Sequence, residues 1–167
     1  MDDQQKRPVS IDLSWLAGMW EADGSFSLNK NKNQTKYIQY EPHLQFVNTD
    51  LMIIEEVIRI LKDLQVGYYF MSRIQPENFG KKLKYEIRVQ GMKRCGKLLG
   101  YLLQYLRGQK KQRAAYIKEY IDLRLSKPKN QRYGDEEHSL FRRYEEYNER
   151  LQEFSTTNMS NTYANRT

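Results

Sequence analysis

The sequence has little cysteine, since Cys95 is the only one in 167 residues. A single cysteine excludes an internal disulfide framework and any zinc site built from several thiolates. Apolar runs are short as well, and none reaches the roughly 20 residues of a membrane-spanning helix. The N-terminal residues are polar and lack the apolar core of a signal peptide. We therefore expect an intracellular protein, in the cytoplasm of a prokaryote or in an organelle, with no membrane partner.

Positive charge is in excess. The chain has 28 lysine and arginine residues against 21 acidic ones, a formal net charge of +7 and a sequence pI of about 9.4. Residues 107–132 contain nine basic and two acidic residues, so the net charge of this stretch equals that of the whole chain. Such a balance is typical of proteins with a polyanionic partner, although soluble basic proteins without one also show it.

Hydrophobic periodicity predicts an α+β fold. Stretches with apolar residues at helical spacing alternate with pairs of stretches in which every second residue is apolar. The predicted order is helix, two strands, helix, two strands and helix, at residues 12–23, 25–29, 37–48, 51–64, 68–74, 83–89 and 93–106. Two more helices are predicted at residues 110–125 and 135–154.

The chain is long enough for one domain with a substantial core. We expect this domain to cover residues 1–154, with the core at about 10–125 and a helical extension at 126–154. Residues 155–167 are small and polar and are predicted to form a disordered tail.

One stretch, residues 12–26, combines features that do not suit an ordinary helix. Glu21 and Asp23 lie in the last turn, although the partial negative charge of a helix C-terminus favours cations there. That placement makes sense if a cation binds at this end. Gly24 follows, and it could close the helix in the left-handed conformation. Gly18 and Ala22 are four residues apart on one side, a spacing that lets a second helix approach closely.

Residues 16–26, Leu-Ala-Gly-Met-Trp-Glu-Ala-Asp-Gly-Ser-Phe, resemble the signature motif of the LAGLIDADG homing endonucleases. The Leu-Ala-Gly start, the Ala-Asp-Gly end and the following Ser-Phe match. Trp20 stands where the family usually has a branched aliphatic residue, and Glu21 where it often has Asp. The resemblance covers about residues 10–125. It implies an αββαββα homing-endonuclease core with a four-stranded antiparallel DNA-binding sheet, to which this chain adds C-terminal helices.

The motif occurs once in the chain. In this family two motif helices pack side by side and each supplies one acid, so a single copy implies a homodimer and a near-palindromic DNA site. The expected interface lies on the motif helix, at Trp15, Ala17, Gly18, Trp20 and Ala22.

The resemblance also implies a metal-dependent active site. Asp23 would bind Mg²⁺ or Mn²⁺, with the backbone carbonyl of Ala22 as a further ligand, whereas Ca²⁺ would bind without supporting cleavage. One or two carboxylates suit Mg²⁺, because this ion keeps several waters and also takes substrate phosphates as ligands.

Two other polar groups are implied at the active site, one after the second strand and a lysine after the third helix. By position, the first is Asn48, with Gln45 as the alternate, and Asn48 could instead cap a helix. The lysine is Lys110, with Lys111 as the alternate, although Gln109 could hold the family position. Both lysines could simply bind phosphate.

The polar positions of the predicted strands are candidates for base readout, because strands fit the major groove and alternate side chains can reach base edges. These positions are Ser27, Asn29, Gln39, Glu41, His43, Gln45, Lys84, Glu86 and Arg88. In the third strand the face is ambiguous, and Arg73 is the preferred candidate. Phosphate contacts are expected from Lys30, Lys32, Lys36 and Lys111. A solvated sheet face is the alternative.

These features favour a sequence-specific double-stranded DNA endonuclease that cleaves a long near-palindromic site by metal-dependent phosphodiester hydrolysis. The alternative is a non-cleaving DNA-binding regulator, or an RNA splicing maturase, on the same scaffold. Asp23 favours the enzyme, because a protein that only binds DNA has no need of an acid facing phosphates. The resemblance alone suggests that an intron or mobile element encodes the protein.

Overall fold

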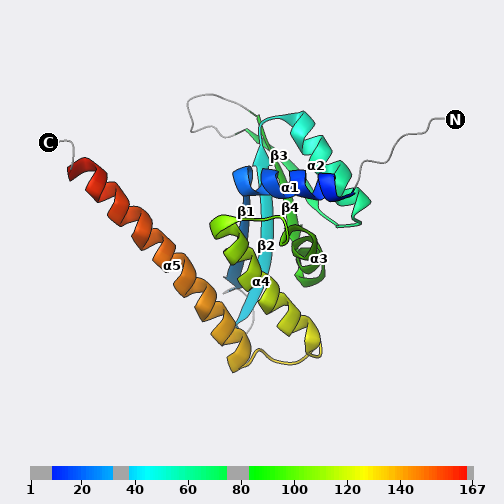
Figure 1. Ribbon diagram of the computed structural model, residues 1–167. Coiled ribbons are helices and arrows are strands. Elements are labelled where there is room, and N and C mark those ends of the chain that lie inside the picture. The colour runs from blue at the N-terminus through cyan, green and yellow to red at the C-terminus, as the bar shows by residue number, and fades with distance from the viewer. Residues whose placement is uncertain (1–8, 32–37, 75–82, 165–167) are drawn as a thin grey trace.

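The computed structural model describes residues 9–31, 38–74 and 83–164, with side chains described up to residue 153. Figure 1 shows the order of the elements along the chain. They are α1 (Val9–Asp23), β1 (Gly24–Asn31), β2 (Gln39–Asn48), α2 (Leu51–Asp63), β3 (Tyr69–Ile74), β4 (Leu83–Gln90), α3 (Met92–Leu102), α4 (Gly108–Ser126) and α5 (Asp135–Ala164). The predicted α+β class and the predicted order of elements are confirmed.

The four strands form one antiparallel sheet in the order β1-β2-β4-β3. The alternation that predicted the strands is also their pattern of burial. Phe26 pairs with Leu44, which pairs in turn with Val89, and all three side chains are buried on one face. All five helices supply side chains to this core, including Phe141 and Tyr144 of α5. Figure 1 shows the helices arranged around the sheet.

The C-terminal end of α1 is fixed by a close contact between Trp20 and Gly24. Trp20 is fully buried and packs against the rings of Phe26 and Phe46, with centroids 6.4 and 5.5 Å away. A Cβ atom on Gly24 would lie 2.2 Å from Trp20 Cδ1. The left-handed conformation predicted for Gly24 is wrong, because Gly24 begins β1 and has no positive φ. A glycine is needed at this position because any larger residue would overlap the Trp20 ring.

Replacing Gly24 by Ala is therefore expected to destabilise the protein by about 1–3 kcal/mol, the usual cost of overpacking a tight core. The added methyl can be accommodated only if the buried Trp20 ring moves. Urea unfolding of the variant measures the change. Gly100→Ala is the control, because the nearest atom to its Cβ would be at an ordinary 3.9 Å. Equal stability of the two variants would contradict the packing argument.

Helix α5 contacts β1 and β2 through three side chains. The backbone N–H of Leu28 donates to the hydroxyl of Tyr144 at 3.2 Å, and the ring of Phe141 stacks on Tyr40 with centroids 4.0 Å apart. His138, in the first turns of α5, hydrogen-bonds to the Tyr40 hydroxyl at 2.7 Å. The first of these bonds satisfies one backbone N–H of the edge strand β1.

The predicted end of α5 is wrong. The helix continues past Phe154 to Ala164, through most of the stretch predicted to be disordered. At its start, Glu137 is fully buried with Arg124 and Lys127. Although burial acts to raise it, the pKa of the Glu137 carboxyl is lowered, because Lys127 and the Gly134 amide donate to it.

In the described part of the chain, no helix is both long and apolar enough to cross a membrane. Cys95 is a buried residue of α3, and its thiol lies 3.4 Å from the carbonyl oxygen of Pro42. Burial raises the pKa of this thiol to about 12, which makes it a poor nucleophile.

Candidate active site and nucleic-acid interface

Asp23 is the last residue of α1, and its side chain is exposed at the junction with β1. Its carboxylate oxygen Oδ2 accepts a hydrogen bond from Asn48 Nδ2 at 2.8 Å. Asn48 is itself held, because its Oδ1 accepts from the backbone N–H of Asp50 at 2.8 Å. Asp50 caps α2 by accepting from the N–H of Met52. The end of β2 and the start of α2 thus orient the Asp23 carboxylate.

A lysine ammonium lies at the carbonyl end of α1. Lys110 Nζ, from the first turn of α4, donates to the backbone oxygens of Glu21 at 2.5 Å and Gly24 at 2.7 Å. The oxygens of Trp20 and Ala22 lie 3.3 and 3.4 Å from it. Desolvation lowers the pKa of Lys110 below its ordinary value, while the Glu21 carboxylate acts in the opposite direction. Lys110 thus places a cation of the chain itself at this helix end, where the sequence indicated a bound one.

Glu21 and Asp23 have different surroundings. Glu21 Oε1 accepts from the backbone N–H of Arg107 at 2.6 Å, just before α4 begins at Gly108. The negative charge of this carboxylate therefore stabilises the adjacent N-terminus of α4. The bond also fixes the start of α4, and with it Lys110, against the end of α1. Sequence reasoning missed this link, because it joins segments that are far apart in the chain.

The residues at this site fit a magnesium ion that is shared with substrate. Nowhere among the described residues do three or more His, Cys, Asp and Glu side chains gather into a group able to hold a metal. Asp23 offers one exposed carboxylate, and Asn48 occupies only its Oδ2. The Ala22 carbonyl is in reach of Lys110, so as a metal ligand it would be shared with the ammonium. One carboxylate with phosphate and water suits Mg²⁺.

A largely polar face, which also includes Val47 and Met71, extends from Asp23 along the sheet. Strand register places most of the predicted readout residues on this one face: Ser27, Asn29, Gln39, Glu41, His43, Gln45, Lys84, Glu86 and Arg88. The register also resolves the face of β3, because Arg73 pairs with Lys84 and so lies on the polar side.

The predicted phosphate contacts are less uniform. Lys30 belongs to β1 and not to a loop. It pairs with Tyr40, so it lies on the face of the sheet that the helices cover. Lys111 is exposed in the first turn of α4. Lys32 and Lys36 lie outside the described residues.

Glu86 is buried within the polar face, at 6% exposure. It accepts a hydrogen bond from Gln45 Nε2 at 2.8 Å and forms an ion pair with Arg88. Arg73 Nη2 lies 3.6 Å from its other carboxylate oxygen. The prediction of Glu86 as a free acceptor for a base is therefore wrong, because its oxygens are already occupied. Gln45, the alternate to Asn48, contacts this carboxylate and not Asp23.

Helix α1 has an exposed side made of small residues. Gly18 and Ala22 are exposed, Trp15 is half-buried, and a Cβ on Gly18 would meet nothing within 4 Å. Ala17 and Trp20 are buried in the protomer's own core at 1% and 0% exposure. The prediction that these two side chains contact a second chain is wrong, because they leave no surface for it.

Two features thus define the class of fold. Helix α1 contains the motif of residues 16–26 and ends at an exposed acid, and the polar face of the four-stranded sheet lies beside that acid. A family model described as LAGLIDADG endonuclease matches residues 16–131. The chain belongs to the LAGLIDADG endonuclease family. Among proteins with curated descriptions, none matches.

Solved structures of homing endonucleases share the fold. I-CvuI, in complex with the I-CreI target, is 22% identical over 68% of each chain, with a TM-score of 0.53. The archaeal intron-encoded I-Vdi141I, complexed with DNA, is 17% identical over 83% of this chain and 99% of its own, with a TM-score of 0.54. I-CeuI, encoded by a group I intron and complexed with DNA, is 15% identical over 73% of this chain and 59% of its own, with a TM-score of 0.55.

Proposed function

We propose that the protein is a homodimeric, sequence-specific double-stranded DNA endonuclease that depends on Mg²⁺ or a similar divalent ion. The observation that carries the proposal is the position of Asp23, an exposed and oriented carboxylate at the point where the small-residue side of α1 meets the polar sheet face. A protein that only bound DNA would gain nothing from this acid, because carboxylates repel phosphates. The DNA-bound structures of similar fold support the same reading.

Asp23, with the Ala22 carbonyl, would hold the metal together with a scissile phosphate. A bound divalent ion supplies a nucleophilic water and stabilises charge on the leaving oxygen. The chain's own groups have other tasks. Asn48 holds the carboxylate in one orientation, and Lys110 fixes the last turn of α1. The polar sheet face binds the DNA and places one strand at Asp23.

A second copy of the chain would complete the site. The exposed positions of Gly18 and Ala22 allow two α1 helices to approach closely about a two-fold axis, which brings the two Asp23 side chains near each other. Each protomer would then read one half of a near-palindromic target of roughly two helical turns.

Selection from a randomised duplex library tests the function directly. In Mg²⁺, the protein should enrich cleaved duplexes that share one near-palindromic sequence. In Ca²⁺, the same sequences should be bound and left intact. Enrichment of bound but uncleaved duplexes in every metal tested would instead indicate a DNA-binding regulator. Enrichment of RNA in a parallel selection from an RNA library, with no duplex enriched, would indicate a maturase.

Replacing Glu86 by Gln is expected to alter sequence preference more than stability. The buried carboxylate holds Gln45 and Arg88 in place, and an amide of the same shape cannot pair with the arginine. Discrimination at the base pairs read by these two side chains should fall by about tenfold, since one well-oriented contact contributes roughly 1–3 kcal/mol. Repeating the selection with the variant measures this.

The matched control is Glu41→Gln, an exposed acid on the same face that lies 3.7 Å from His43. It should leave the preference at the base pairs read by Gln45 and Arg88 unchanged. An unchanged preference in the Glu86 variant would show that the buried carboxylate does not position the reading groups.

A further inference from the structure

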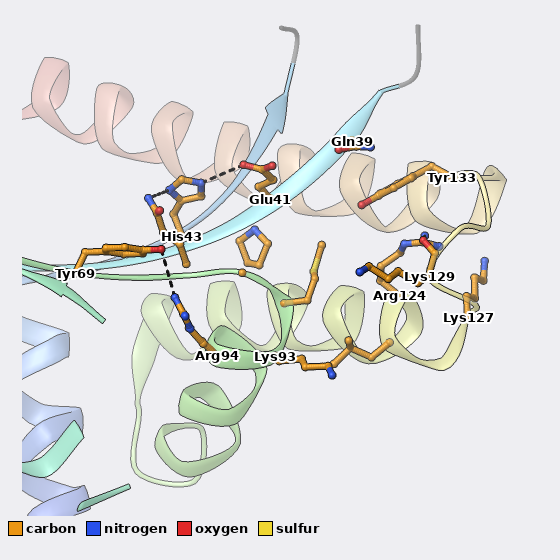
Figure 2. A pocket seen from close by; sticks show the side chains of 15 residues that line it. Gln39, Glu41, His43, Tyr69, Lys93, Arg94, Arg124, Lys127, Lys129 and Tyr133 are labelled. Carbon is orange, nitrogen blue, oxygen red and sulfur yellow. Dashed lines mark hydrogen bonds and ion pairs between the residues drawn. The ribbon is translucent and has the colours of Figure 1, made fainter. Parts of the chain in front are cut away.

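A basic groove lies at the end of the polar face that is remote from Asp23. Its volume is about 880 Å³. One wall is formed by Glu41 and His43 of β2 with Gln90 of β4, and Figure 2 shows these side chains hydrogen-bonded or ion-paired to one another. The other walls come from the start of α3, the end of α4 and the segment before α5.

Five cationic side chains line this groove: Lys93, Arg94, Arg124, Lys127 and Lys129. The sequence analysis assigned none of them, because three separate elements bring them together. Glu41 is the acid that lines it. A strongly positive groove of this kind attracts a polyanion.

Two of the five cations have structural roles. Arg124 donates to the Gln131 carbonyl at 2.7 Å, and its guanidinium lies 4.6 Å from the centroid of the Tyr133 ring. Lys127 is ion-paired with Glu136 and Glu137 at 2.6 and 3.0 Å. These contacts hold the segment between α4 and α5 against the groove.

Lys93 and Lys129 are available to a ligand, whereas Arg94 already contacts Tyr69. Lys93 and Lys129 are exposed, and within the described ranges their ammonium groups have no ion-pair partner. Gly91, with φ of 89°, makes the sharp turn from β4 into α3 that brings Lys93 to the groove. Arg94 extends toward Tyr69 of β3, with Nη1 3.5 Å from the hydroxyl (Figure 2).

The position of the groove identifies its occupant. Asn48, at the Asp23 end of β2, and Glu41, in the groove wall, are seven residues apart. At a rise of about 3.3 Å per residue, this is about 23 Å along the strand. Duplex DNA advances about 3.4 Å per base pair, so on a duplex whose axis follows β2 the groove lies roughly seven base pairs outward from Asp23. A duplex on the polar face would continue into it, because the groove and the face share residues of β2.

We infer that this groove binds the phosphodiester backbone of the DNA at the outer end of each half-site, through Lys93, Arg94 and Lys129. The inference rests on the proposed function and adds to it a contact that depends on duplex length. The occupant is backbone because exposed lysine and arginine side chains bind phosphates without reading sequence. Bases are read by the polar strand positions nearer Asp23.

The test uses the full chain and the duplex enriched by selection, trimmed from both ends in steps of two base pairs. Lys93 and Lys129 are replaced together by Gln. The control replaces Lys62 and Lys118, which lie on α2 and α4 and remove the same charge away from the polar face. DNA affinity is measured at about 50 and about 200 mM salt. Each phosphate contact makes affinity fall more steeply with salt, so the fall over this range should be about tenfold smaller when two contacts are lost.

The expected result is a weaker salt dependence for the Lys93 and Lys129 variant on the longest duplexes only, and no difference from the control once the outer base pairs are trimmed away. The inference would be overturned if the variant and the control had the same salt dependence at every duplex length. It would also be overturned if the salt dependence of the Lys93 and Lys129 variant were reduced equally at every length. If neither the variant nor the unaltered chain binds any duplex, it is the proposed function that fails.

Discussion

Replacing Asp23 by Asn is expected to reduce DNA cleavage by well over 100-fold while leaving DNA affinity within about threefold. Groups that only support a metal ligand cost roughly 10–100-fold when removed, so loss of the ligand itself should cost more. The fold should persist, because the side chain is exposed and Asn48 can still donate to an amide oxygen at the same place. Affinity should not fall, since a negative charge next to phosphates is removed.

The measurement is single-turnover cleavage of the selected duplex, with binding followed separately in Ca²⁺. Asp63→Asn is the control, because Asp63 is an exposed acid at the end of α2 and its partner there is Arg59, at 2.8 Å. The control should cut as the unaltered protein does. Undiminished cleavage by the Asp23 variant would show that the motif acid is not the metal ligand.

Replacing Lys110 by Met is expected to lower both stability and cleavage. A methionine side chain fills a similar space but cannot donate to the oxygens of Glu21 and Gly24, which are then left in a partly buried position. Unsatisfied buried carbonyls cost about 1–3 kcal/mol. In a domain of this size, a loss of about 2 kcal/mol lowers Tm by roughly 4–8 °C. Cleavage should fall as well, because the end of α1 that carries Asp23 loses its cap.

Thermal unfolding, cleavage and the salt dependence of binding together distinguish the possible roles of this lysine. Lys111→Met is the matched control, since Lys111 is the exposed neighbour on the same turn of α4. A residue that only bound phosphate would reduce the salt slope by about one and leave Tm unchanged. That pattern for the Lys110 variant, or cleavage and Tm both equal to those of the control, would contradict the capping role.

Much of the fold could be predicted, because its elements have simple periodicities. The strand faces follow from alternation, and Asp50 was identifiable as the cap of α2 from its place before an apolar stripe. The face of β3 could not be decided in the same way, since both of its sides contain apolar and polar residues. The pairing of Met71 with Glu86 settles it.

The failures share one physical cause, which is that side-chain surroundings depend on tertiary contacts. Glu86 alternates correctly as a polar-face residue, yet neighbouring cations and Gln45 enclose it. Trp20 has the spacing of an interface residue, but its ring lies in the core. Its indole Nε1 is buried without a hydrogen-bond partner among the described residues, at a cost of about 1–3 kcal/mol. A motif cannot reveal such a departure.

The cation at the end of α1 shows how far sequence reasoning reached. Two acids in the last turn of a helix indicated a nearby positive charge. The structure supplies one as the Lys110 ammonium, and the Arg107 amide that binds Glu21 comes from the same junction. The chemical requirement was therefore predictable, whereas its source lies more than eighty residues away along the chain.

The central claim is that two copies of this chain, each with one Asp23, act on one near-palindromic site. The most direct test measures the mass of the complex on the selected duplex by sedimentation, alongside cleavage of the full site and of an isolated half-site. The account predicts two chains on each full-site duplex, cleavage of that duplex in Mg²⁺, and no cleavage of the half-site. One chain per duplex with efficient cutting of the half-site would contradict it.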